Sequence, residues 1–528
     1  MSTLLRLPTA TRVATTPLQP IHADRLIIAT NRGPVEYFMS QQQVLKPRRG
    51  AGGVVTALVG AAKNIDVSWV AMAMTEGDRI AIKERQQDGV MKSPLRDQNM
   101  LLRYVAIPKT AYRKHYEQIS NQLLWFVQHY MYDSNGEEQS NRKIQDAWNN
   151  GYMVANRAIA DAVNAEIERG EGTPVVMLHD YHLYLAPATI REVHPTIIMQ
   201  QFIHIPWPDI RCWQLLPGNI SEAIFNGLVG NDIIGFQTER DAHNFMEGAR
   251  TILDGSVVDF ESGAIWWKGH HTQVRAYPIS ISVTDEKRQA QSLAGKRAVE
   301  PLRPLLEKQT IMRVDRIEPT KNILRGFQAY ALMLEQHPEL RGAVNFLAFL
   351  VPSRQTLSKY KRLGSDVEKL VNEINERFGT MDWKPITAFY ENDRVQALAA
   401  MRFYDVLLVN PIIDGMNLVA KEGPVVNRQN GVLVLSRTAG AFQQLGKAAI
   451  PVTSTDVAET ANALYQALTM PRDERRAMSQ QARHAVEDHD LNEWLQCQFD
   501  DINALLDRLS ARVSAHEAIY SVPVENAG

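Results

Sequence analysis

Short apolar segments, each followed by polar residues and then by a stretch with helical spacing, recur in two series along this chain. The first series includes residues 174–178, 197–203 and 231–236, which are typical of buried parallel strands. The second includes residues 344–351 and 406–409. Strands that alternate with helices in this way predict an α/β protein with open parallel sheets, which bind ligands at the carboxyl ends of their strands.

The chain has 528 residues, which is too long for a single hydrophobic core, so at least two domains are expected. The polar, charged run that starts at residue 285 separates the two series and places a domain boundary there. We therefore predict one domain at 25–284 and a second at 285–485. Residues 1–24 mix Thr, Pro and Arg and are expected to form a disordered leader, with a transit peptide as the alternative, and residues 511–528 a flexible tail.

Composition excludes several classes of function. The formal net charge is -2, so no overall basic field attracts nucleic acid or anionic lipid, and any phosphate site must be local. Two cysteines, Cys212 and Cys497, provide neither a disulfide framework nor zinc-ligand spacing, which indicates a reducing cytoplasm. No apolar run approaches the roughly 18 residues of a membrane span, so we expect a soluble cytoplasmic protein.

The stretch 313–322 places Arg316 and Lys321 where a short strand meets a helix whose first turn suits Pro319. Helix N-termini at strand ends bind anions, because their backbone N–H groups lack partners. A diphosphate is the ligand that such a pair of cations favours. For this decapeptide alone, the simpler interpretation is a surface Arg and Lys beside a turn.

Two further turns have features of anion or sugar sites. Gly52 and Gly53 precede a helical stretch, where glycines allow backbone N–H groups to approach a phosphate, although such turns are also common for steric reasons alone. The strand at 406–409 leads into a turn and helix start with Asp414 and Glu422 on either side. Carboxylates in this position can accept hydrogen bonds from sugar hydroxyls, while the backbone N–H groups of the turn face phosphate or sugar oxygens.

Histidines and an aspartate follow two consecutive strands of the first series, namely Asp180 and His182 after one and His204 after the next, whereas His179 still belongs to its strand. A metal site would use the same residue types, but the spacing favours polar sugar binding. Tyr116 and Trp125 lie nine residues apart on a predicted helix, and spacing alone assigns both to core packing.

These motifs resemble the trehalose-6-phosphate synthase family, retaining sugar-nucleotide glycosyltransferases with two Rossmann-like domains in the GT-B arrangement. The resemblance covers residues 25–509, and it rests on the Asp-Gly-Met-Asn-Leu-Val-Ala-Lys-Glu run from Asp414 to Glu422, on His-Asp-Tyr-His with His-Ile-Pro at His204, and on the Arg-(x)4-Lys pair. It implies an active site in the cleft between the domains and a C-terminal helix, 486–510, that crosses back to the first domain.

The resemblance also implies roles for residues on the donor side. Arg316 and Lys321 would bind the diphosphate of UDP-glucose, or of another nucleoside diphosphate glucose, and stabilise the leaving nucleotide. Asp414 and the turn after it would hold the glucose and phosphate, and Glu422 the ribose. The implied donor-binding residues are Gly52, Gly53, Arg316, Lys321, Asp414, Gly415, Met416, Asn417, Leu418 and Glu422.

On the acceptor side, the resemblance implies that Asp180 contacts the acceptor sugar and that His204 contacts the donor sugar near the reacting centre. The implied acceptor residues for glucose 6-phosphate are Arg32, Tyr116, Trp125, Asp180 and Arg354, and the implied catalytic residues are Arg316, Lys321, His204 and Asp180. The family's chemistry uses no protein nucleophile and requires no metal or other cofactor. A homo-oligomer is possible.

Three motifs depart from the common synthase pattern. Glu318-Pro319-Thr320-Lys321-Asn322 replaces Asp-Tyr-(Ser/Thr)-Lys-Gly, Ile412-Ile413 precedes Asp414 in place of Leu-Arg, and Gln444 replaces a Glu. The Pro-x-Lys-Asn form is similar to the pseudo-glycosyltransferase branch that joins cyclitols. Against that branch, Tyr116 and Arg32 keep the sugar-phosphate type of acceptor site, so the prediction is a trehalose 6-phosphate synthase. The alternatives are a synthase that uses glycerol phosphate or a cyclitol phosphate as acceptor, and a catalytically silent sensor of sugar phosphates.

Overall fold

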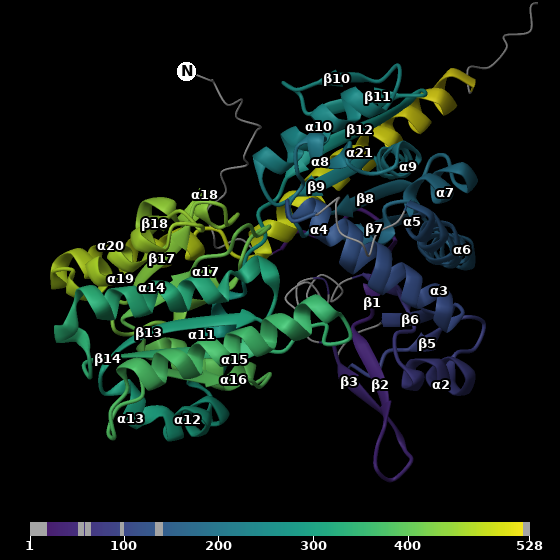
Figure 1. Ribbon diagram of the computed structural model, residues 1–528. Coiled ribbons are helices and arrows are strands. Elements are labelled where there is room, and N and C mark those ends of the chain that lie inside the picture. Colours follow the sequence, from purple (N-terminus) through teal and green to yellow (C-terminus); the bar gives the residue numbers. More distant parts are fainter. Residues whose placement is uncertain (1–17, 51–57, 59–64, 96–99, 133–140, 521–528) are drawn as a thin grey trace, which may run out of the picture. The chain divides into compact units, whose positions relative to one another are not determined.

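Two sheets carry the strands that the apolar segments predicted, as Figure 1 shows for the computed structural model. The structure describes residues 18–50, 58, 65–95, 100–132 and 141–520, with residues 512–520 as backbone only. Among these, residues 18–277 and 492–520 form unit 1, and Pro278–Leu491 form unit 2. The prediction of an α/β protein is confirmed.

The sheet of unit 1 has the order β10-β11-β12-β9-β8-β7-β1-β4-β6-β5, in which the strands from β12 to β6 are parallel to their neighbours. Its members are β1 Arg25–Arg32, β4 Asp66–Met72, β5 Met91–Lys92, β6 Met100–Val105, β7 Pro174–His179, β8 Ile198–Phe202, β9 Ile233–Phe236, β10 Val257–Asp259, β11 Ala264–Trp267 and β12 His270–Ala276. A separate hairpin joins β2 Val35–Met39 to β3 Leu45–Arg49.

The sheet of unit 2 is parallel throughout, in the order β15-β14-β13-β16-β17-β18. Its strands are β13 Gln309–Arg316, β14 Val344–Val351, β15 Ile386–Phe389, β16 Val406–Val409, β17 Val432–Ser436 and β18 Ile450–Val452. Both parallel sheets have the Rossmann strand order, which reverses direction between β1 and β7 in unit 1 and between β13 and β16 in unit 2. Ligands are expected beyond the carboxyl ends of these strands.

Helices connect the strands and pack their apolar faces on the sheets. Those of unit 1 are α2 Glu76–Arg85, α3 Lys109–Arg113, α4 Trp125–Gln128, α5 Asn141–Ala147, α6 Met153–Arg169, α7 Ala186–Val193, α8 Ile210–Trp213, α9 Gly218–Leu228 and α10 Glu239–Ile252. Those of unit 2 are α11 Val283–Gln291, α12 Leu293–Val299, α13 Arg303–Leu306, α14 Ile323–Gln336, α15 Ser358–Phe378, α16 Arg394–Ala400, α17 Val419–Val426, α18 Phe442–Leu445, α19 Val457–Thr469 and α20 Arg472–Glu487.

The last helix, α21 Leu491–Tyr520, belongs almost entirely to unit 1. Trp494 packs edge-on against Phe202 of β8, with ring centroids 5.2 Å apart, and Gln498 hydrogen-bonds Gln200 at 2.7 Å. The chain before β1 also contacts this helix, because the backbone N–H of His22 donates to the side chain of Asn503 at 2.7 Å. The leader was predicted at residues 1–24, but the described structure already begins at residue 18. The C-terminal helix was predicted at 486–510, and α21 continues to Tyr520.

The chain passes from unit 1 to unit 2 at Tyr277 and Pro278, earlier than the boundary predicted near residue 285. The charged run from 285 was interpreted as a separator, but it forms α11 and α12 of unit 2. Such helices are amphipathic, with only Glu286 and Ala290 of α11 buried, so their polar composition resembles that of a linker.

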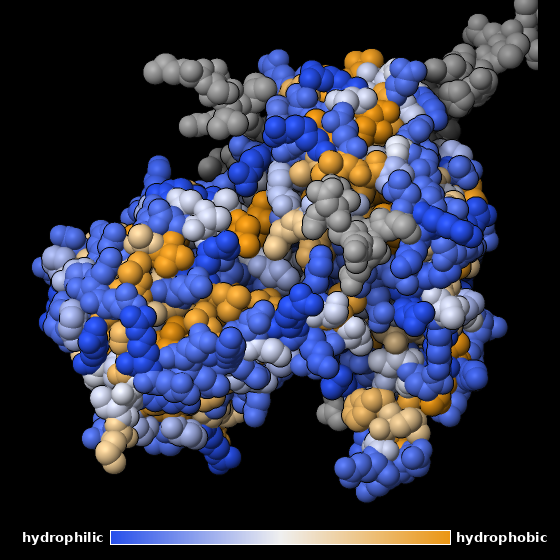
Figure 2. All heavy atoms as spheres, in the orientation of Figure 1, coloured by the Kyte–Doolittle hydropathy of each residue, from blue (hydrophilic) through white to orange (hydrophobic). Residues whose placement is uncertain are grey.

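The face seen in Figure 2 is mainly hydrophilic. Within the described residues, no helix is both long and apolar enough to cross a membrane.

Candidate functional site

The loop after β13 carries the two cations predicted to bind a diphosphate. Arg316 is the last residue of the strand, and Lys321 ends a short 3₁₀ turn before α14. The guanidinium of Arg316 is half exposed and lies 3.1 Å from the carboxylate of Glu318. The ammonium of Lys321 is nearly buried and forms an ion pair with Asp414, in the loop after β16. The loops after β13 and β16, the two strands beside the reversal point of this sheet, therefore contribute one partner each to the Lys321–Asp414 ion pair.

Lys321 is positively charged at neutral pH. Burial lowers its pKa, but Asp414 and Asp315 raise it by more, so the pKa lies above the ordinary lysine value. Asp315 is in turn held by Arg313, a fully buried arginine whose guanidinium donates to Asp315 at 2.9 Å and to the carbonyl of Lys321, also at 2.9 Å. Arg313 thus fixes the backbone that carries Lys321. Arg313 was not predicted to support the site, because nothing in its local sequence pattern indicates that it is buried.

Asn322, one of the departures from the common synthase pattern, has a structural explanation. Its backbone adopts the left-handed conformation, with φ 57° and ψ 38°, which glycine adopts readily and which asparagine tolerates better than most residues. Its side-chain amide donates to the carbonyls of Asn410, at 3.0 Å, and Ser454, at 2.6 Å. Asparagine can therefore take the place of glycine here and adds two contacts that tie α14 to neighbouring loops.

Backbone carbonyl groups of the turn after β16 accept hydrogen bonds from the loop that follows β17. Gly440 N–H donates to the carbonyl of Asp414, at 3.0 Å, and Ala441 N–H to that of Met416, at 2.8 Å. A Cβ at Gly440 would lie 1.8 Å from the carbonyl oxygen of Gly415, so only glycine fits this close approach. Asn417, with φ 74°, donates to Asp414 at 3.1 Å. Within the described residues, the N–H groups from Gly415 to Leu418 have no acceptor, as predicted for a turn that faces ligand oxygens.

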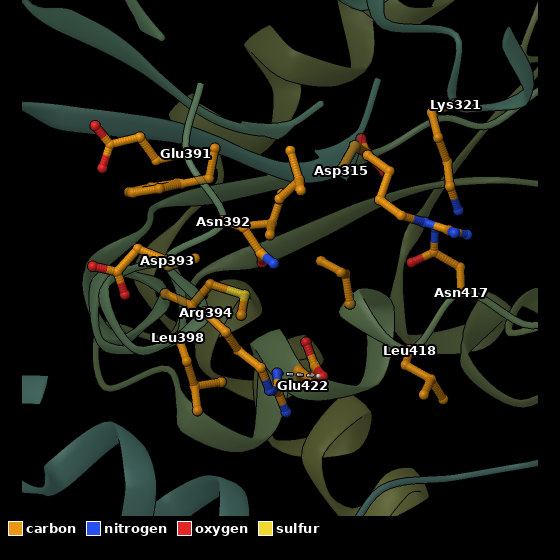
Figure 3. A pocket seen from close by; sticks show the side chains of 17 residues that line it. Asp315, Lys321, Glu391, Asn392, Asp393, Arg394, Leu398, Asn417, Leu418 and Glu422 are labelled. Carbon is orange, nitrogen blue, oxygen red and sulfur yellow. Dashed lines mark hydrogen bonds and ion pairs between the residues drawn. The ribbon is translucent and has the colours of Figure 1, made fainter. Parts of the chain in front are cut away.

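A pocket of about 260 Å³ brings these elements together (Figure 3). Lys321 and Asn417 lie at one side of the view, and Arg394 and Glu422 lie together at another. Five residues predicted to bind the donor line the pocket, namely Arg316, Lys321, Asn417, Leu418 and Glu422. Gly52 and Gly53, also predicted there, lie outside the described residues.

Glu422 belongs to a group of three charges. Arg394 donates to Glu422 at 3.1 Å and to Glu286 of α11 at 2.6 Å. Both carboxylates are buried, and burial raises the pKa of Glu422 to about 7, with Arg394 opposing this shift and Glu286 adding to it. Sequence reasoning missed Arg394 and Glu286, because α11 was interpreted as a linker and Arg394 starts a helix with no recognisable motif.

In unit 1, Asp180 follows β7 with an unusual backbone, φ 73° and ψ 174°, a region that is almost exclusive to glycine. Its N–H donates to the carbonyl of Phe202 at 2.8 Å, and its carbonyl accepts from Gln201 at 3.1 Å, so β8 holds this conformation in place. Strain of this kind persists where the surrounding structure enforces it, and it is concentrated at functional sites. This supports the sequence-based assignment of Asp180 to a site.

His204 is paired with His179, their ring nitrogens Nε2 and Nδ1 being 3.3 Å apart. Burial lowers the pKa of His179 to about 3, and burial together with His179 lowers that of His204 well below its ordinary value. Both rings are therefore neutral at neutral pH. His179 was interpreted as a core residue of its strand, and it is buried, but its contact with His204 makes it a support for a predicted site residue.

Tyr116 and Trp125 were assigned to core packing from their spacing, and Trp125 is indeed buried, but both side chains contact the turn after β7. Nine residues of α-helix make about two and a half turns, which would place them on opposite faces. The segment Lys114–Leu124 is instead a π-helix, whose wider turns bring them onto one side. Tyr116 stacks on His182 with centroids 5.8 Å apart, and Trp125 lies 5.9 Å from Tyr181. The π-helix could not be predicted from the apolar pattern.

The two arginines predicted to bind the acceptor phosphate belong to different units. Arg32 ends β1 in unit 1, half exposed, with Glu36 at 3.2 Å. Arg354 follows β14 in unit 2, where its guanidinium donates to the hydroxyl of Tyr360 at 2.6 Å. The expected location of the active site between two domains stays a prediction.

Among the residues that the structure describes, no group of three or more His, Cys, Asp or Glu is arranged to hold a metal ion.

Two Rossmann-like sheets, each with charged residues beyond the strands where its order reverses, define the GT-B class of proteins. Solved structures of this class match the chain. An E. coli structure, "Trehalose-6-phosphate from E. coli bound with UDP-2-fluoro glucose", has a TM-score of 0.78 at 26% identity and covers 91% of this chain and 99% of its own. An alpha,alpha-trehalose-phosphate synthase (UDP-forming) from Burkholderia xenovorans, in complex with glucose-6-phosphate, has a TM-score of 0.77 at 27% identity, covering 90% and 99%.

The chain belongs to Glycosyltransferase family 20, whose model matches residues 24–504. The bifunctional trehalose-6-phosphate synthase/phosphatase of Thermoproteus tenax is 31% identical over 94% of this chain. The trehalose-6-phosphate synthase of Citrobacter koseri is 30% identical over 85% of this chain and 90% of its own length. The chain spans 65% of the Thermoproteus protein and 51% of an Arabidopsis thaliana relative. The predicted family and GT-B fold are thus confirmed.

The charge group around Glu422 generates a prediction about pH. A carboxyl with a pKa of about 7 becomes ionised as the pH rises through 7. The ionised form accepts stronger hydrogen bonds from hydroxyl groups, so a ligand whose hydroxyl groups reach Glu422, with UDP-glucose as the probe, should bind roughly threefold to tenfold more tightly at pH 8 than at pH 6. Calorimetric titration at several pH values measures this change.

Glu286→Gln removes a negative charge beside Glu422 and should lower its pKa, moving the transition in affinity to lower pH. Glu335→Gln, which removes a carboxylate paired with Arg377 at 2.5 Å and outside the pocket, is the matched control and should leave the transition in place. A profile that is flat in the wild type, or identical in Glu286→Gln, would contradict the role given to this group.

Proposed function

We propose that the protein is a retaining glycosyltransferase that transfers glucose from a nucleoside diphosphate glucose, UDP-glucose in the first instance, to glucose 6-phosphate and forms trehalose 6-phosphate. The observation that carries the proposal is the pair Arg316 and Lys321 at the reversal point of the unit 2 sheet, with Lys321 bound to Asp414. The relatives bound with UDP-2-fluoro glucose and with glucose-6-phosphate support this choice of substrates.

In the proposed reaction, negative charge develops on the leaving diphosphate. Arg316 and Lys321 would stabilise it, because cations already fixed in place lower a barrier without having to reorganise. The donor glucose would lie against Asp414 and the N–H groups of the following turn, and the ribose against Glu422. The acceptor hydroxyl attacks from the same face and gives its proton to the leaving phosphate oxygen, so the reaction needs neither a protein nucleophile nor a metal ion.

On the acceptor side, Asp180 would hold the sugar, and the neutral ring of His204 would contact the donor sugar. A neutral imidazole suits this role, since it can exchange hydrogen bonds with hydroxyls without adding charge. Arg32, Tyr116, Trp125 and Arg354 would bind the 6-phosphate and its surroundings. We also propose a cytoplasmic location and leave open a homo-oligomer, both of which follow from sequence composition and resemblance.

The first test of this function is Lys321→Ala. A charge-assisted hydrogen bond contributes about 1.5–3 kcal/mol, so turnover should fall by roughly tenfold to hundredfold, while the KM for glucose 6-phosphate changes little. Steady-state kinetics with both substrates measures the difference. Lys369→Ala, which removes an exposed lysine on α15, is the control. Near-normal turnover in Lys321→Ala would remove this residue from the chemistry.

The second test concerns the acceptor. If arginine side chains bind the 6-phosphate, an acceptor without phosphate lacks these charge-assisted hydrogen bonds, and kcat/KM for glucose should be about a hundredfold or more below that for glucose 6-phosphate. Arg354→Ala should reduce this ratio, chiefly by impairing glucose 6-phosphate, whereas the exposed Arg377→Ala should preserve it. Equal use of both sugars by the wild type would refute the acceptor. A preference for glycerol phosphate or a cyclitol phosphate would support the phosphate site but would refute glucose as the acceptor sugar.

A further inference from the structure

Glu318 lies between the two arginines of unit 2 to which phosphate-binding roles are assigned. One of its carboxylate oxygens is 3.1 Å from Arg316 and 3.8 Å from Arg354, and it accepts a hydrogen bond from the Ser353 hydroxyl at 2.9 Å. The side chain is fully buried and is not among the residues that line the pocket. Glu318 therefore acts on ligands only through its neighbours.

The charge of this group is well defined. Burial raises the pKa of Glu318, but Arg316, Arg354 and Lys321 lower it by more, so the pKa lies below the ordinary glutamate value. An ionised and buried carboxylate is stable only when it is paired. The two guanidinium groups are the cations nearest to this carboxylate, and Lys321 adds to their effect.

Arg354 is constrained from a second side. Its backbone has a φ of 44°, which is unusual for a residue with a side chain, and its guanidinium donates to the Tyr360 hydroxyl at 2.6 Å. Arg316 ends β13, which pairs with β14 in register at Val351, three residues before Arg354. Two adjacent strand ends therefore present one arginine each, and Glu318 joins them.

We propose that Glu318 is a positioning residue whose buried carboxylate holds Arg316 and Arg354 together and so sets the affinity for the two phosphate-bearing substrates together. The inference rests on the proposed function for the identity of the substrates. Loss of the carboxylate has two opposing effects: it makes the region more positive, which attracts anions, and it releases two guanidinium groups that repel each other. We infer that the second effect dominates, because an arginine fork binds phosphate well only in a fixed orientation.

Glu318→Gln, which keeps the shape and removes the charge, tests this inference. We expect the KM for UDP-glucose and the KM for glucose 6-phosphate each to rise about tenfold, the effect of one lost charge-assisted contact. Glu318→Asp introduces the residue that common synthases have at this position and keeps the negative charge. Its KM values for both substrates should therefore lie closer to those of the wild type than the values of Glu318→Gln do. Glu335→Gln is the control for loss of a paired glutamate, and thermal unfolding checks that each variant is folded.

Double-mutant cycles separate positioning from a general loss of structure. In an Arg316→Ala background, Glu318→Gln should no longer affect UDP-glucose but should still affect glucose 6-phosphate. In an Arg354→Ala background the reverse should hold. The inference is overturned if Glu318→Gln affects one substrate only, if it lowers either KM, or if its effects persist unchanged in both backgrounds.

Calorimetry with UDP and with inorganic phosphate distinguishes a failure of the inference from a failure of the proposed function. If the wild type does not use glucose 6-phosphate, the proposed function fails, and Glu318→Gln should still weaken the binding of both probes. Unchanged binding of both probes in the variant overturns the inference, as does a wild type that binds neither of them.

Discussion

The ion pair between Lys321 and Asp414 is the contact on which the rest of the unit 2 site depends. It joins the loops after β13 and β16, two strands that pair directly at Met312 and Leu407. A buried ammonium group without a partner is strongly unfavourable, so the two loops must keep their places for the lysine to stay charged. Arg313 holds the backbone of Lys321, and Asn417 donates to the same carboxylate oxygen of Asp414 that Lys321 contacts.

Several residues in and beside the candidate sites have an unusual backbone conformation. Residues with side chains and positive φ include Asp180, Asn322, Arg354 and Asn417, and each lies at the start of a loop or helix that follows a strand of the two sheets. Hydrogen bonds hold these conformations, such as those that Asn322 makes to two neighbouring loops. Burial and pairing elsewhere offset the free-energy cost of this strain. The strained conformations place charged and polar groups where a ligand can reach them.

Much of the fold could be predicted, because strands and helices follow from local periodicity. The strand at 406–409 agrees with the structure at both ends, and the strand that delivers Asp180 differs by one residue. The π-helix between Tyr116 and Trp125 could not be predicted, since a change in the width of a helical turn leaves no signature in the apolar pattern. The same limit applies to α11, whose polar surface resembles a linker although Glu286 is buried.

Local patterns in the chain were enough to predict which kinds of group stand at the end of each strand: one cation at the end of β13 and another in the loop after it, a carboxylate and a turn after β16, and an aspartate and a histidine after β7. The pairing of these charges is visible only in the folded protein. Lys321 meets Asp414 and Arg394 meets Glu286 across 93 and 108 residues of chain, and Glu318 is shared by two arginines. Periodicity describes which side of an element faces the core, whereas pairing depends on which strands become neighbours, and that is set by packing of the whole sheet.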